Sequence, residues 1–158
     1  MSEATRFIPI PGGFLVVLRQ GDDVFARLGA LMREEAIGSA AFSGFGFVNS
    51  ATFGFFDFEA GDYQPKTMQN LELTNLTGTL AWKEGEPAIH AHATAGDASF
   101  RTFGGHVLSL EVGRGSLEIV ITVFPGRLER AVDPDIGANM LQLYEYPVTL
   151  PGSGSRCL

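Results

Sequence analysis

The chain has 158 residues, a formal net charge of -7 and 45% hydrophobic residues, which fits a single domain with its own core. Its 11 lysines and arginines are scattered singly along the chain, so the charge argues against binding to the phosphate backbone of nucleic acid. Cys157 is the single cysteine, and no apolar run is long enough to cross a membrane, so we expect a reducing, cytoplasmic location without a membrane partner.

The signals for regular structure divide the chain into three parts. These are an N-terminal segment, 1–13, a folded domain, 14–143, and a C-terminal tail, 144–158, which we expect to be partly disordered. The domain begins with a predicted strand at Phe14–Leu18.

A helix is predicted after this strand, from about Asp23 to Ala36. Apolar residues recur there at helical spacing and form one stripe: Val24, Phe25, Leu28, Leu31 and Met32. An Asp in Gly21-Asp22-Asp23 is suited to cap the helix, and Gly38 is expected to end it.

The remaining signals are those of strands. Strands are predicted at Ala40–Phe47, Ala51–Phe58, Thr67–Leu73, Leu76–Lys83, around His90 and His92, at Phe103–Leu110, at Leu117–Phe124 and near Met140–Leu143. Gly44, Gly46 and Gly54 mark bulges or close approaches of the backbone. The sequence therefore predicts an α+β domain with a largely antiparallel, strand-rich sheet and one principal helix.

All three histidines of the chain fall close together, at His90, His92 and His106. Alternate residues of a strand share a face, and the strand with His106 can lie beside the strand with His90 and His92. Three imidazoles with no cysteine or fourth histidine to close the shell favour a divalent metal, zinc above all, with an open position for water or a small ligand. The alternative is a set of half-buried histidines with ordinary hydrogen-bond partners.

The order of several short motifs resembles the plants-and-prokaryotes-conserved (PPC) domain. The resemblance rests on Arg19-Gln20-Gly21-Asp22, Phe42-Ser43-Gly44-Phe45-Gly46, Ala51, Phe55-Phe56-Asp57, Glu72-Leu73-Thr74-Asn75-Leu76-Thr77-Gly78, His90-Ala91-His92, Gly96-Asp97 and Gly104-Gly105-His106. It implies a compact fold that assembles as a homotrimer, with the histidine cluster in a zinc-binding pocket near a subunit boundary. Self-association also agrees with the apolar composition.

The same resemblance implies an alternative function as a DNA-binding or regulatory interaction protein. Plant members of the family carry an AT-hook, but this chain has no Arg-Gly-Arg-Pro hook, and Asn70 and Asn75 depart from the family's pattern. A scaffold trimer without a metal is a third possibility.

The histidine pattern is also similar to that of acetolactate decarboxylase, a zinc enzyme. An enzyme of this kind would be a metal-dependent lyase or hydrolase of a small carbonyl-bearing substrate. Glu72 is then the candidate acid or base, and Arg19 is the candidate fork for a carboxylate. The alternatives are a hydrogen bond of Glu72 at a subunit contact and an ion pair of Arg19 with Asp22 or Asp23.

Overall fold

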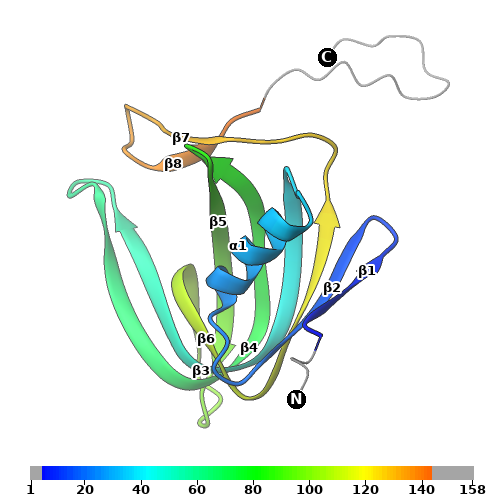
Figure 1. Cartoon of the computed structure of the whole chain (residues 1–158). Coiled ribbons are helices and arrows are strands. Elements are labelled where there is room, and N and C mark those ends of the chain that lie inside the picture. The colour runs from blue at the N-terminus through cyan, green and yellow to red at the C-terminus, as the bar shows by residue number, and fades with distance from the viewer. Residues whose placement is uncertain (1–4, 144–158) are drawn as a thin grey trace, which may run out of the picture.

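The computed structural model describes residues 5–143, which form one helix and two antiparallel sheets (Figure 1). The elements are β1 (Phe7–Ile10), β2 (Gly13–Arg19), α1 (Val24–Glu34), β3 (Ala40–Asp57), β4 (Asp62–Lys83), β5 (Glu86–Gly96), β6 (Thr102–Val123), β7 (Arg130–Val132) and β8 (Asn139–Leu141). The predicted α+β class, with one principal helix and a largely antiparallel sheet, is confirmed. Within residues 5–143 no helix has the length and apolar character needed to cross a membrane.

The main sheet closes on itself through its longest strands. Its order is β1-β2-β6-β3-β4-β5, and β5 also pairs with β6, so β6, β3, β4 and β5 form a ring. The start of β6 lies against β5, its end lies against β2, and β3 runs along most of its length. This closure brings the start of β6 next to the C-terminal half of β5.

Three pairs of predicted strands each form one continuous strand in the structure. Ala40–Phe47 and Ala51–Phe58 merge into β3, and the same holds for the predicted pairs within β4 and β6. The predicted breaks are places where the pairing register shifts, as between Val48 and Ser50. A Cβ at Gly46 would lie 2.2 Å from the Ser116 carbonyl oxygen, so the predicted close approach is confirmed there.

Helix α1 is capped at its start as predicted and ends earlier than predicted. The Asp23 side chain accepts a backbone hydrogen bond from the first turn, and four residues of the apolar stripe are buried: Val24, Leu28, Leu31 and Met32. The helix ends at Glu34, and the chain turns at Ala36, whose φ is 51°. Gly38 does not end the helix; it allows close contact with the Gly126 carbonyl oxygen, which would lie 2.5 Å from a Cβ at Gly38.

The helix and the histidines lie on opposite faces of the sheet. On β5, Ala91, Ala93 and Ala95 are buried in the core cluster that also contains residues of α1. His90 and His92 alternate with these alanines and therefore project from the outer face. Figure 1 shows α1 lying across the inner side of the curved sheet.

The chain after β6 folds back over the edge of the main sheet. The Trp82 backbone N–H donates to the Leu128 carbonyl, 2.9 Å, and β7 then pairs with β8. Strand β8 corresponds to the strand predicted near Met140–Leu143. Strands β7 and β1 were not predicted, and β1 lies in the segment 1–13 and pairs with β2. The predicted disorder of the tail 144–158 lies outside the described residues.

Candidate metal centre

The closed sheet places the three histidines together on its outer face. His90 and His92 are alternate residues of β5, and His92 is the direct register partner of His106 on β6. Gly104 makes this close pairing possible, because a Cβ there would lie 2.1 Å from the Ala93 carbonyl oxygen. The predicted convergence of the three imidazoles is therefore present in the fold.

The distances within this histidine cluster suit a shared ion. Ring centroids lie 5.3 Å apart for His90 and His92, 5.0 Å for His90 and His106, and 5.3 Å for His92 and His106. One ring nitrogen from each residue lies within 4.8 Å of the other two. Nitrogens bound to one tetrahedral zinc at about 2.0–2.1 Å stand roughly 3.4 Å apart, so small side-chain rotations complete the approach.

An unsatisfied nitrogen in the cluster fits a metal ligand. Nδ1 of His106 is buried and finds no hydrogen-bond partner among residues 5–143. A buried polar atom without a partner carries a desolvation cost that a metal bond would remove. The residues present therefore fit a divalent ion held by three imidazoles.

Tyr63, which the sequence analysis did not select, forms one wall of the site. Its ring stacks on His106 with centroids 4.4 Å apart and planes 15° apart, and Phe56 packs against its edge at 5.0 Å. Gly54 makes room for this stacking, because a Cβ there would lie 2.8 Å from the Tyr63 ring. Burial raises the pKa of the Tyr63 hydroxyl.

Arg130 on β7 is a second residue that the sequence analysis did not select. It is only 8% exposed, and its Nη2 donates to the hydroxyl of Thr79, 2.6 Å, while Nη1 lies 3.4 Å from the Asn139 carbonyl. Thr79 is the register partner of His90, so the guanidinium lies next to the histidine cluster. Its Nε is buried without a hydrogen-bond partner in the part of the chain that the structure describes.

Burial and positive charge favour the neutral form of two of the imidazoles, those of His90 and His106. Burial, followed by the nearby positive charges of His90 and His92, lowers the pKa of His106 to about 4. Burial and then Arg130 lower the pKa of His90 as well. Since a metal binds the neutral imidazole, both residues are in their ligating form at neutral pH.

Glu72, the predicted acid or base, lies away from the histidines within one chain. It is exposed on β4 and pairs with Gly96, whereas Thr77 on the same strand pairs with His92. Five residues of strand separate the two pairings, which is roughly 16 Å at about 3.3 Å per residue. Its catalytic role stays a prediction, and it would require the histidines of another copy of the chain.

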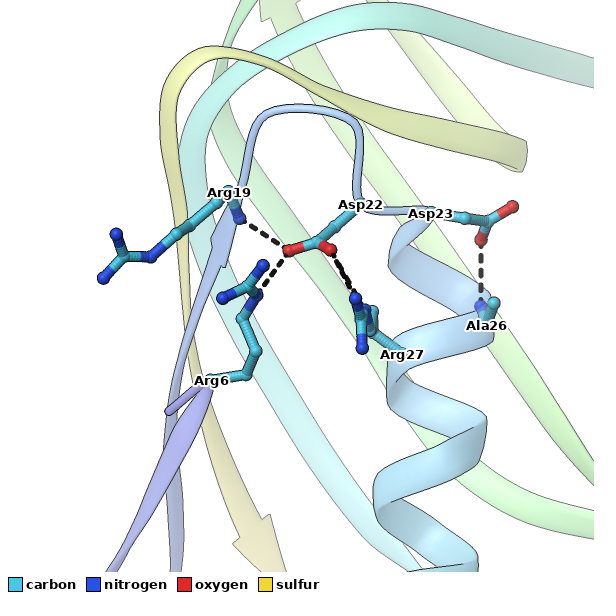
Figure 2. A network of polar contacts seen from close by, with 6 residues as sticks. All are labelled: Arg6, Arg19, Asp22, Asp23, Ala26 and Arg27. Atoms are coloured by element: carbon cyan, nitrogen blue, oxygen red, sulfur yellow. Dashed lines mark hydrogen bonds and ion pairs between the residues drawn. The ribbon is translucent and has the colours of Figure 1, made fainter. Parts of the chain in front are cut away.

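Arg19, the predicted carboxylate fork, ends β2 and pairs with Ser116 on β6, whereas His106 lies near the start of β6. Its backbone N–H donates to Asp22, 2.8 Å, while Figure 2 shows its side chain extending away from that carboxylate. The side chains that bind Asp22 are those of Arg6 and Arg27. Burial alone would raise the pKa of Asp22, but these hydrogen bonds outweigh it and lower the pKa. The role predicted for Arg19 stays a prediction.

Comparison with known proteins gives a family match over most of the chain. The profile of the Plants and Prokaryotes Conserved (PCC) domain matches residues 10–125. A curated protein from Synechococcus, named bifunctional protein GlmU, is 30% identical over 146 residues, which cover 89% of this chain and 22% of that protein. The chain thus spans about a fifth of the length of that relative.

Two solved structures are similar over nearly their full lengths. A protein from Ralstonia eutropha JMP134, provisionally described as DNA-binding, is 52% identical, with a TM-score of 0.86 and coverage of 88% of this chain and 96% of that one. A protein from Archaeoglobus fulgidus, described as metal-containing, is 29% identical, with a TM-score of 0.75 and coverage of 89% and 100%.

The similarity to acetolactate decarboxylase extends to the fold. The enzyme from Bacillus subtilis subspecies spizizenii is 13% identical, with a TM-score of 0.54, over 78% of this chain and 56% of that one. At this identity only the shared fold follows.

Proposed function

The chain belongs to the Plants and Prokaryotes Conserved domain family, and from this premise we propose that it is a metal-binding protein. Its ion is held by His90, His92 and His106, and water or a small ligand occupies the open coordination position. The observation that carries this proposal is the cluster of three ligating nitrogens within 4.8 Å of one another. It is supported by the buried Nδ1 of His106, which has no partner within the described residues, and by the metal-containing relative from Archaeoglobus fulgidus.

Zinc is the proposed ion, because three neutral imidazoles with an open fourth position form its usual ligand set in reactive sites. When bound, such an ion acts as a Lewis acid that polarises a carbonyl or lowers the pKa of a bound water. The chain's own residues keep two imidazoles neutral, and Tyr63 limits the movement of the His106 ring by stacking on it.

The metal proposal is tested by elemental analysis of the full chain purified without a polyhistidine tag. Wild-type protein is expected to carry about one transition metal ion per chain, and His92→Ala to carry much less. Lys66→Ala, on an exposed position of β4, is the matched control and keeps the wild-type metal content. Equal metal content in wild type and His92→Ala would contradict the proposal.

A homotrimer is the proposed assembly. The outer face of β3 and β6 exposes Phe45, Phe47 and Val120 to solvent in the single chain, at 57%, 44% and 44%. An apolar strip of this kind is typical of a subunit contact.

DNA binding is the second candidate, because the relative from Ralstonia eutropha JMP134 carries that provisional description. The net charge of -7 opposes it. Fluorescence anisotropy with labelled duplex DNA at low salt separates the two candidates. We expect no binding, and affinity that falls steeply with added salt would favour the second candidate.

A further inference from the structure

Arg130 carries a buried positive charge that nothing in the described chain neutralises. Its side chain touches a hydroxyl and a carbonyl oxygen, and within residues 5–143 no carboxylate forms an ion pair with it. Arg130 is only 8% exposed, and this burial lowers its pKa, as expected for a cation that has lost water without gaining a carboxylate partner. A negatively charged partner from outside the described chain would relieve this cost.

The Nε donor of Arg130 lies on the edge of the guanidinium that suits a carboxylate. Nε and Nη2 point to the same side of the planar group, and Nη2 has a second N–H besides the one it gives to Thr79. Arginine binds carboxylates through two such parallel N–H groups. The contact with Thr79 holds the guanidinium in place, which leaves this edge preorganised.

The position of Arg130 links this edge to the metal centre. Thr79 and His90 are direct partners across β4 and β5, so their Cβ atoms are about 4.5–5.5 Å apart. The Arg130 guanidinium therefore lies beside the imidazoles that would hold the ion. A divalent ion on the histidines would add positive charge beside Arg130, and an anionic ligand offsets both charges at once.

We propose that the small ligand of the metal centre is a carboxylate, bound through one oxygen at the open metal position and through the Nε and Nη2 edge of Arg130. This inference rests on the proposed metal function and names the chemical class of its ligand. It assigns to Arg130 the carboxylate-binding role that the sequence analysis gave to Arg19.

The test uses the full chain loaded with Co²⁺, whose visible spectrum reports on changes in coordination. Acetate is the probe, acetamide is its neutral counterpart of the same shape, and inorganic phosphate is the competing anion. Acetate is expected to change the spectrum saturably, at lower concentrations than acetamide or phosphate. Equal responses to acetate and acetamide, or a stronger response to phosphate, would overturn the carboxylate assignment without any variant.

Variants separate ligand binding from a structural role of Arg130. Arg130→Met is expected to keep its bound metal but lose acetate affinity by about 10-fold or more, as for a lost charge-assisted hydrogen-bond pair. Arg130→Lys, which keeps the charge, should have an acetate affinity between those of the wild-type protein and Arg130→Met. Lys83→Met is the matched control, because Lys83 also holds the β7–β8 hairpin, through Asn139 at 2.9 Å, and should bind acetate like wild type.

The outcomes distinguish the two proposals. A wild-type protein that takes up no metal overturns the metal centre and the ligand assignment together. A metal-loaded Arg130→Met protein with wild-type acetate affinity overturns only the ligand assignment. If Arg130→Met does not fold, the comparison of acetate with acetamide on wild type decides.

Discussion

At the scale of single residues, His106 connects the site to the stability of the fold. Its pKa in the folded chain is about 4, against 6.5 in its ordinary environment, because burial and neighbouring positive charge disfavour the imidazolium. Below the ordinary value the unfolded chain takes up a proton that the folded chain does not. The free energy of unfolding of metal-free protein should therefore fall as pH decreases from 6.5 toward 4.

This loss of stability at low pH is measured by urea unfolding of chelator-treated protein at about pH 7 and about pH 5. His90 contributes in the same direction, since its pKa is also lowered. His106→Gln, which does not titrate, should lose less stability between the two pH values than wild type. A wild-type protein with the same free energy of unfolding at both pH values would contradict the assigned pKa.

The residues of the site differ in how far the sequence could predict them. The histidines could be found because the alternation of His90 and His92 is local and a short segment separates them from His106. Tyr63 and Arg130 come from distant segments of the chain. Only the closure of the main sheet and the return of the chain at β7 bring them to the histidine cluster. Neither residue has a local signal. For Arg130, the lack of a partner becomes visible only when its surroundings are known.

At the scale of elements, the approach of β5 to β6 depends on one missing side chain. Gly104→Ala would put a Cβ 2.1 Å from the Ala93 carbonyl oxygen, so the two strands must separate beside the His92–His106 pair. We expect the free energy of unfolding to drop by about 1–3 kcal/mol, the range for overpacked sites. Metal affinity should drop with it.

Gly96→Ala is the control for this prediction, because it lies on the same β5–β6 hairpin and a Cβ there meets nothing within 4 Å. Thermal unfolding and zinc titration on both variants make the comparison. Equal zinc affinity in Gly104→Ala and Gly96→Ala would show that the strand spacing does not control the site.

The elements themselves show where sequence patterns mislead about length. Alternating burial continues through β3 and β4, but glycines and polar residues at the bulges resemble turns between shorter strands. A register shift keeps the strand continuous while it disturbs the local alternation, as between Leu73 and Asn75. The helix has no such ambiguity, since its apolar stripe and its Asp23 cap agree.

At the scale of the whole molecule, the two faces of the sheet have different partners. The inner face is covered by α1 and forms the core, whereas the outer face carries the histidine cluster and an exposed apolar strip. Composition alone suggested spare apolar surface, but the register of β3 and β6 decides where it lies. Phe45 pairs with Glu118, and Val120 pairs with Ser43, so apolar and polar side chains meet on this strip.

This strip leads to the last prediction, which concerns assembly. Light scattering after size exclusion is expected to give about three times the chain mass of 16.9 kDa for the wild-type protein. Phe45→Asp places a second carboxylate opposite Glu118 at the centre of the strip, so the trimer should dissociate toward monomers. Ile136→Asp is the control, because Ile136 is 41% exposed in the turn between β7 and β8 and lies outside β3 and β6. Wild type at the mass of one chain, or Phe45→Asp with unchanged mass, would remove β3 and β6 from the contact between subunits.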